Sequence, residues 1–164
     1  MDEKIIIGQV CQKIKNRFSF FEDVKTELLM IENRGRPIWI CGESPLEAAV
    51  NYNRKELIRM MVNDCGFDID SESGYIKRSA LQSAISKKNE YLVRFLVLEM
   101  KATVNINYPP NYSPLCRAIS LDDTPMVRLL IEELGADVNF RIFCITKEGT
   151  PFLALHHAMR HDYA

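Results

Sequence analysis

Residues 113–139 contain the sequence that decides the fold of this 164-residue chain. The stretch begins with Ser113-Pro114-Leu115-Cys116-Arg117-Ala118-Ile119 and ends with Gly135-Ala136-Asp137-Val138-Asn139. A serine before a proline is typical of a helix start, because the hydroxyl can cap an orphan N–H and proline lacks one. Apolar residues then recur at helical spacing over 125–131, and the glycine suits a helix end that needs positive φ. The stretch therefore predicts two helices joined by a turn.

Two earlier stretches repeat this pattern. Similar openings begin at Ser44 and Ser79, and the three serines are 35 and 34 residues apart. The second apolar segments carry arginines with the same spacing, Arg59, Arg94 and Arg128. A fourth opening, Thr150-Pro151-Phe152, predicts a helix that runs to about residue 161. A period of about 34 residues predicts a stack of similar supersecondary units.

At these motifs the chain resembles the ankyrin repeat family, whose units have two helices, a β-turn and the signature T-P-L-H-x-A. The resemblance implies an all-α fold, an ankyrin-repeat solenoid of helix–turn–helix units with projecting hairpin loops. It places a degenerate N-terminal capping repeat and linker at 1–43. Ankyrin repeats follow at 44–78, 79–112 and 113–149, the last with a long finger loop. Residues 150–164 are then a partial C-terminal repeat or cap.

The pattern also assigns core positions. We expect small alanines where helices pack closely and large leucines between repeats; these residues are Ala49, Ala84, Ala118, Leu46, Leu81 and Leu115. At the N-terminus, apolar residues at helical spacing predict a capping helix over 3–15. Ser19 and Glu22 form a capping-box pattern that predicts a second helix after it.

The repeats depart from the family pattern in three ways. Lys101 stands where the other units have glycine, which predicts a strained or differently shaped helix end. The histidine after T-P-L is replaced, and the residues there are Glu47, Gln82, Cys116 and Leu153. Each second helix is one residue longer than the pattern. These departures predict lower stability than that of an idealised array.

Composition excludes several classes of protein. Hydrophobic residues make up 47% of the chain and charged residues 26%, which is typical of globular proteins. The net charge of −1 disfavours a dedicated binder of nucleic acid or anionic membranes. Five cysteines without metal-ligand spacing indicate reduced thiols, and we expect no export signal. The expected location is therefore cytoplasmic or nuclear, or the host cytosol for a secreted effector.

Candidate catalytic and metal sites are weak. His157 and His161 have a helical i, i+4 spacing, with His156 beside them, but no third ligand is identifiable. Cys116 or Cys144 could act as a nucleophile only with an oriented base, and the sequence indicates none. No phosphate-binding glycine motif occurs. We therefore expect neither catalysis nor a metal or other cofactor.

A binding surface has stronger support. Aromatic and basic residues gather in the segments between repeats and on the inner helices, and these types are enriched in interface hot spots. The candidate partner-binding residues are Trp39, Tyr52, Tyr75, Lys77, Tyr108, Tyr112, Arg117, Leu121, Phe140, Arg141 and Phe143. For each loop aromatic, the alternative is that it only buttresses a neighbouring hairpin. By contrast, the three repeat-spaced arginines are expected to form a solvated outer row.

The sequence thus predicts a non-catalytic protein–protein interaction module, monomeric on its own. It would bind another protein or a peptide segment through its concave groove and finger loops. The alternative is the partner-targeting region of a larger multidomain protein or secreted effector, with catalysis encoded beyond residue 164. The apolar Leu153, Leu155 and Met159 favour such a continuation.

Overall fold

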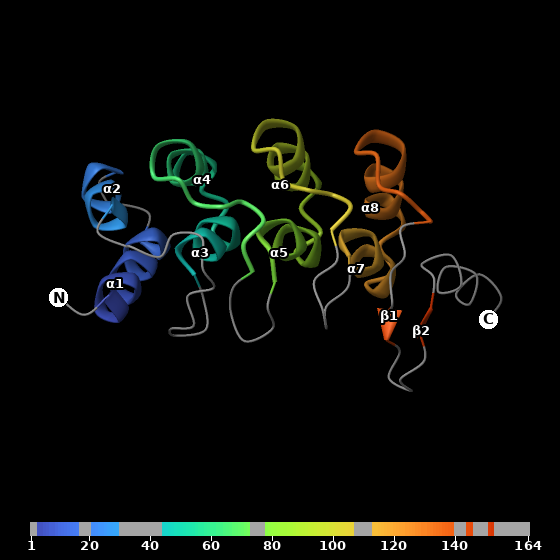
Figure 1. Cartoon of the computed structure of the whole chain (residues 1–164), viewed down its shortest axis with the longest axis horizontal. Helices are drawn as coiled ribbons and strands as arrows, with labels where there is room; N and C mark the ends of the chain where they lie inside the picture. The colour runs from blue at the N-terminus through green and yellow to red at the C-terminus, as the bar shows by residue number, and fades with distance from the viewer. Residues whose placement is uncertain are drawn as a thin grey trace. The chain divides into compact units, whose positions relative to one another are not determined.

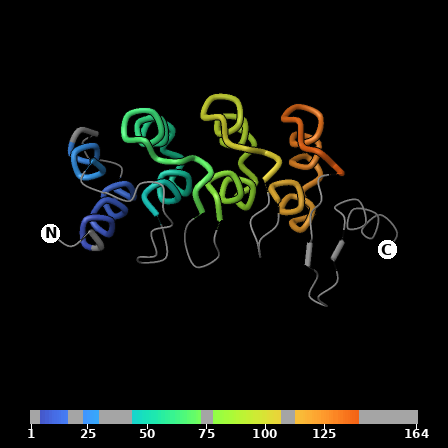
Figure 2. Tube along the Cα trace, viewed as in Figure 1, coloured from blue at the N-terminus to red at the C-terminus, as the bar shows by residue number. Residues whose placement is uncertain are grey.

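The computed structural model of the protein describes residues 3–16, 21–29, 44–72, 78–106, 113–139, 144–145 and 151–152. They divide into two compact units, residues 1–83 and residues 84–164 (Figure 1). Each repeat follows the same path of helix, turn and antiparallel helix (Figure 2). The described secondary structure is helical apart from one short hairpin, which confirms the all-α repeat fold.

The first unit starts with a helix pair. The pair consists of α1 (Glu3–Lys15) and α2 (Phe21–Leu29), and α1 packs against α3 (Pro45–Asn51). The second helix of the first repeat is α4 (Lys55–Arg59), which continues as a π-helical turn, η1 (Met60–Asp64). Both helices predicted for the N-terminus are therefore present, although Ser19 lies outside the described residues.

The second unit contains most of the second repeat and the whole described part of the third. Helix α5 (Ala80–Ser86) spans the boundary between the units and precedes α6 (Glu90–Arg94) with η2 (Phe95–Glu99). The third repeat has α7 (Pro114–Ser120) and α8 (Thr124–Arg128) with η3 (Leu129–Glu133). The hairpin pairs β1 (Cys144–Ile145) with β2 (Pro151–Phe152) in antiparallel register.

Serine caps begin the first helix of each repeat. Ser44 Oγ accepts a hydrogen bond from the Glu47 N–H at 3.1 Å, and Ser113 Oγ accepts one from the Cys116 N–H at 3.2 Å. Ser79 forms a reciprocal capping box, because Gln82 Oε1 also accepts the Ser79 N–H at 3.2 Å. Gln82 therefore occupies the family's histidine position and caps its own helix.

The core contains the predicted residues. All three expected alanines and all three expected leucines are buried. The capping helix α1 likewise buries Ile6, Ile7, Val10 and Ile14. Because the alanine side chains are small, the helices of each repeat can pack closely at these positions.

The extra residue in each second helix produces a π-helical turn. The backbone N–H groups of Cys65, Met100 and Leu134 each donate to the carbonyl five residues earlier, at 3.0, 3.2 and 3.1 Å. Such turns accommodate one inserted residue within an α-helix. The insertion therefore leaves buried residues on both sides facing the core, such as Met61 and Cys65.

Two sequence-based predictions are wrong. Pro151 and Phe152 form β2 instead of opening a helix; proline is tolerated there because both strands of a two-stranded ribbon are edges. Cys11 and Cys65 are buried and form no disulfide, but Cys116 is disulfide-bonded. A disulfide depends on tertiary proximity, which cysteine spacing did not indicate.

Candidate partner-binding surface

The structure describes three of the predicted binding residues. The other eight lie outside the described residues; they are Trp39, Tyr75, Lys77, Tyr108, Tyr112, Phe140, Arg141 and Phe143. Tyr52, Arg117 and Leu121 all lie in or at the end of the first helix of a repeat. The described part of the candidate surface therefore belongs to the inner helices.

Tyr52 lies at the C-terminal cap of α3 in the first unit. Its N–H donates to the Ala48 carbonyl at 3.0 Å, which fixes the backbone at the helix end. Tyr52 is 47% exposed, so nearly half of the residue is accessible to a partner. An exposed aromatic residue on an ordered helix end can contribute contact area at low entropic cost.

Arg117 and Leu121 lie one helical turn apart at the C-terminal half of α7. The guanidinium of Arg117 donates from Nε to Ser86 Oγ on α5, over 3.0 Å, and both residues are half-buried. Leu121 is also half-buried. The second unit therefore presents a cation oriented by the preceding inner helix, next to an aliphatic side chain.

The end of the first helix carries a different residue in each repeat. Tyr52, Lys87 and Leu121 occupy equivalent positions, 35 and 34 residues apart. The next position has positive φ each time, in Asn53, Lys88 and Asp122. The turn is thus the same in all three repeats, while the side chain presented beside it changes from aromatic to basic to aliphatic.

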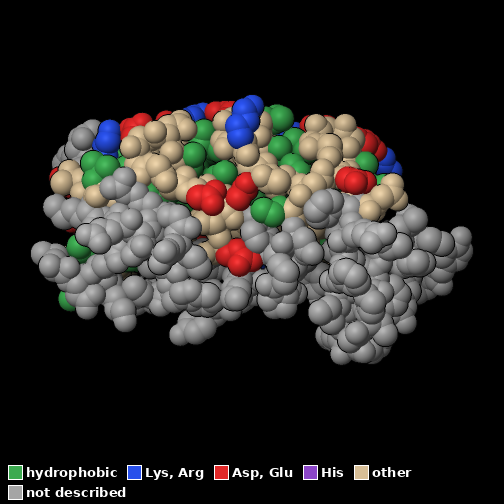
Figure 3. All heavy atoms as spheres, viewed as in Figure 1, with side chains coloured by type: hydrophobic (Ala, Val, Ile, Leu, Met, Phe, Trp, Pro, Cys, Tyr) green, Lys and Arg blue, Asp and Glu red, His purple; other side chains and the backbone are tan. Residues whose placement is uncertain are grey.

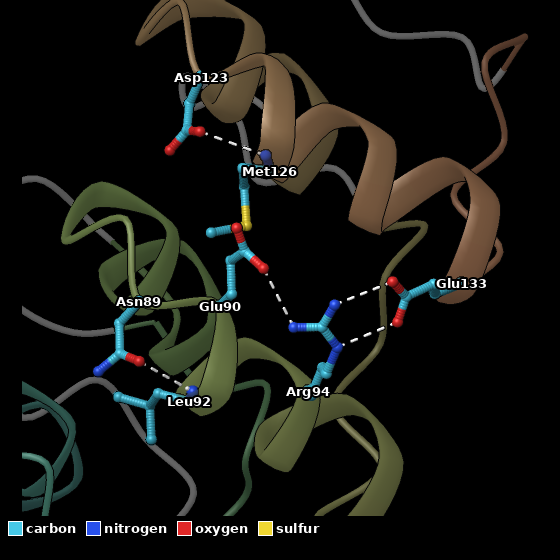
Figure 4. A network of polar contacts seen from close by, with 7 residues as sticks. All are labelled: Asn89, Glu90, Leu92, Arg94, Asp123, Met126 and Glu133. Atoms are coloured by element: carbon cyan, nitrogen blue, oxygen red, sulfur yellow. Dashed lines mark hydrogen bonds and ion pairs between the residues drawn. The ribbon is translucent and has the colours of Figure 1, made fainter.

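The second helices are capped by residues that the sequence analysis did not identify. Asn89 Oδ1 accepts the Leu92 N–H at 3.1 Å, and Asp123 Oδ1 accepts the Met126 N–H at 3.2 Å (Figure 4). The equivalent Arg54 makes no cap, because its side chain has no acceptor. The sequence does carry a signal for these caps, because Asn or Asp just before an apolar-periodic segment is typical of a helix N-cap.

The repeat-spaced arginines form ion pairs on the outer side. Arg59 pairs with Glu56 and Arg128 with Glu132, in both cases on the same second helix. Arg94 pairs with Glu90 on its own helix and with Glu133 of the next repeat (Figure 4). Hydrogen bonds from Arg94 hold the pKa of Glu133 below its ordinary value. All three arginine side chains reach solvent and pair with glutamates, as expected for solvated positions.

Sequence analysis also missed Tyr91, at the start of α6. Its ring is 80% exposed, whereas Glu56 and Pro125 occupy the equivalent solvent-facing positions of the other repeats. The sequence does carry a signal for Tyr91: the neighbouring repeats have glutamate or proline at this position, whereas this repeat has an aromatic residue. Tyr91 lies beside an open depression of about 840 Å³, lined by Lys87, Lys88, Asn89, Glu90, Tyr91 and Arg94.

The candidates for catalysis gain no support. Cys116 is buried and disulfide-bonded, so it offers no thiolate nucleophile. The described residues contain no group of three or more His, Cys, Asp or Glu side chains that could hold a metal ion. The three histidines at residues 156, 157 and 161 lie outside those described residues, as does the side chain of Cys144.

The described surface carries charges of both signs. Acidic and basic side chains are interspersed with apolar ones on the face drawn in Figure 3. Among the helices that the structure describes, none is long and apolar enough to cross a membrane.

Comparison with known proteins agrees with the repeat fold. A family model described as ankyrin repeats, in three copies, matches residues 46–142. A search of curated proteins finds no match to the chain. The matched region covers more than half of the chain and includes all three helix–turn–helix repeats. The chain therefore belongs to the ankyrin repeat family.

Proposed function

We propose that this chain is a non-catalytic module that binds another protein or a peptide segment through the inner helices of its repeats and the loops between them. Ankyrin repeats are generally protein-interaction modules, and ankyrin repeat domains are typically non-catalytic. Fold alone does not define a partner, so the proposal rests on the residues that the repeats present.

The observation that carries the proposal is the pairing of Arg117 with Ser86 beside Leu121. Ser86 orients the guanidinium through the 3.0 Å hydrogen bond from Nε. A side chain that is already oriented loses less conformational entropy when a partner binds. Arginine next to an accessible apolar side chain is a common composition of interface hot spots. The inner helices therefore present a preformed contact instead of a flexible one.

The test is affinity capture with the full chain immobilised. The variants Arg117→Ala and Leu121→Ser remove the inner-helix contact, and Phe143→Ser tests the third finger loop. Arg128→Gln serves as a matched control, because Arg128 is an exposed cation on the outer helix α8. We expect a saturable partner to bind wild type and Arg128→Gln, and to be lost or weakened about tenfold by the inner-helix variants.

Circular dichroism must show equal helicity for all variants. Equal capture by wild type, Arg117→Ala and Leu121→Ser would contradict the inner-helix surface. Loss of binding only in Phe143→Ser would restrict the interface to the finger loop.

A further inference from the structure

A second candidate surface lies at the α5–α6 turn and the start of α6. We call it the outer ledge and define it by the residues that line the open depression: Lys87, Lys88, Asn89, Glu90, Tyr91 and Arg94. All six belong to the second unit and are contiguous or one helical turn apart. Local structure therefore fixes their arrangement, because the turn and the first residues of α6 carry the whole ledge.

Tyr91 supplies the apolar part of the ledge. Its side chain is more exposed than any other large hydrophobic residue that the structure describes, and its hydroxyl has no hydrogen-bond partner among them. Packing therefore does not explain a tyrosine at this position. Tyrosine combines a broad apolar face with a polar tip, which suits a contact that is dry on one side and wet on the other.

Lys87 and Lys88 supply unpaired positive charge. Both are exposed, and neither forms an ion pair or side-chain hydrogen bond with the described residues. The third cation, Arg94, is already engaged: it bonds Glu90 at 3.1 Å and Glu133 at 2.9 and 3.0 Å (Figure 4). The ledge is therefore electropositive at the lysine turn, whereas two carboxylates outnumber the one guanidinium at the Arg94 end.

The backbone conformation of Lys88 is unfavourable for lysine, so the stability of the fold does not explain a lysine at this position. Lys88 has φ of 54°, a left-handed conformation that costs a non-glycine residue about 1–2 kcal/mol. The equivalent Asn53 and Asp122 have the same conformation with side chains that tolerate it better. Lys101 is strained in the same way, but its Nζ donates to the Leu98 carbonyl at 2.8 Å. Lys88 has no such local contact.

We propose that the outer ledge docks an acidic segment of a partner protein. Two neighbouring Asp or Glu side chains would lie over Lys87 and Lys88, and a large apolar side chain would pack on the ring of Tyr91. Glu90 and Glu133 would repel acidic residues placed further along α6, so the segment has one favoured direction. The ledge adjoins the inner-helix contact, because Lys87 follows Ser86, the residue that Arg117 bonds. Its residues are different, so its test does not depend on the proposed function.

Nucleic acid is the less favoured occupant. Its phosphates could contact the two lysines, but Glu90 precedes Tyr91 in the ledge, and Glu90 and Glu133 both pair with Arg94. A phosphate backbone needs a continuous basic track. An acidic peptide needs only the two charges and one apolar contact.

The experiment uses the full chain and synthetic peptides of about twelve residues. One set carries an Asp-Glu pair one to four residues from a Leu, Phe or Trp. Two matched sets replace the acids by Lys or the apolar residue by Ser. Fluorescence anisotropy would measure binding at about 0.05 and 0.3 M NaCl. Fluorescent single-stranded oligonucleotides are titrated in parallel.

Three variants locate the contact. Tyr91→Ser removes the ring, and Lys87→Gln with Lys88→Asn removes both charges while asparagine suits the positive φ at residue 88. Leu98→Ser is the matched control, because Leu98 is also exposed, by 54%, but lies outside the ledge. None of these changes touches a buried position, so all variants should remain folded.

We expect peptides with both acidic and apolar residues to bind at least about tenfold more tightly than either matched set. Binding should weaken at the higher salt concentration. Tyr91→Ser and the double lysine variant should each lose about tenfold, and Leu98→Ser should stay within about twofold. The proposal would be overturned by equal binding of all peptide sets, by equal loss in Leu98→Ser, or by tighter binding of the oligonucleotides through the same lysines.

Discussion

Arg94 and Glu133 join two consecutive second helices through a bidentate ion pair, although they are 39 residues apart in the chain. Arg94 Nε donates to one carboxylate oxygen at 3.0 Å and a terminal nitrogen donates to the other at 2.9 Å. The remaining terminal nitrogen bonds Glu90 at 3.1 Å (Figure 4). One guanidinium therefore ties α6 to η3 and leaves little freedom for its own side chain.

Glu133→Gln should destabilise the protein in a pH-dependent way. Hydrogen bonds from Arg94 lower the pKa of Glu133 in the folded state. A carboxyl with a lowered folded pKa stabilises the fold fully above its unfolded pKa, about 4.3, and loses that effect as pH falls through the folded value. We therefore expect urea unfolding to show lower stability for Glu133→Gln than for wild type at pH 7, and a smaller difference at about pH 3.

The matched control is Glu132→Gln. Glu132 pairs with Arg128 on the same helix over 3.5 Å, and both side chains are largely exposed. An exposed pair of this kind contributes little, so this variant should resemble wild type at both pH values. A pH-independent difference between wild type and Glu133→Gln would mean that the carboxylate charge is not the cause.

Lys101→Gly should stabilise the protein by about 0.5–1 kcal/mol, because glycine adopts positive φ without the steric cost of a Cβ. Lys101 has φ of 62°, and the equivalent Gly66 and Gly135 have φ of 71° and 72°. Loss of the hydrogen bond from Lys101 Nζ to the Leu98 carbonyl reduces the gain but does not reverse it. The change in the urea midpoint measures the effect.

Gly135→Ala tests the same explanation in the opposite direction. A Cβ built at Gly135 would meet no atom within 4 Å, so the substitution adds conformational strain without a clash. We expect a loss of about 1 kcal/mol. A neutral result would show that the φ of this helix end is easily adopted by any residue, and would remove the basis for the Lys101 prediction.

Arg54→Asn should stabilise the first repeat by about 0.5–1 kcal/mol through a new helix cap. Arg54 has φ of −93° and ψ of 71°, close to the values of Asn89 and Asp123, which both cap their helices. The Nε atom of Arg54 is also buried without a hydrogen-bond partner. Arg54→Ala is the control: it removes the same guanidinium but adds no acceptor. Equal stability of the two variants would show that no cap forms.

The sequence predicted the helix starts because their causes are local. Ser44, Ser79 and Ser113 bond to N–H groups three residues later, so each signal lies within a few residues. The prediction of a helix at Pro151 was wrong because the cause of the observed structure is not local. The same Thr-Pro pattern can open a helix or enter a strand, and pairing of Pro151 with Ile145 decided the outcome.

The candidate site was less predictable than the fold. The sequence placed Arg117 on the inner helices, but its bond to Ser86 spans 31 residues and has no local signature. The extra residue of each second helix was visible, whereas its form as a π-helical turn depends on keeping residues such as Met61 and Cys65 buried. In the sequence, Tyr91 differs from the equivalent residues of the other repeats. The exposure of its side chain could be found only from the folded structure.

Ala118→Asp should destabilise the protein by at least about 3 kcal/mol, because it places an unpaired charge and extra volume where helices pack closely. Ala118 is fully buried on α7, and the repeat-equivalent Ala49 and Ala84 are fully buried too. Ser120→Asp adds the same side chain at an exposed position of the same helix and should cost less than about 1 kcal/mol. Circular dichroism during urea unfolding compares the two. Similar midpoints would mean that the close packing assigned to these alanines is wrong, since the two positions lie on the same helix and differ in burial.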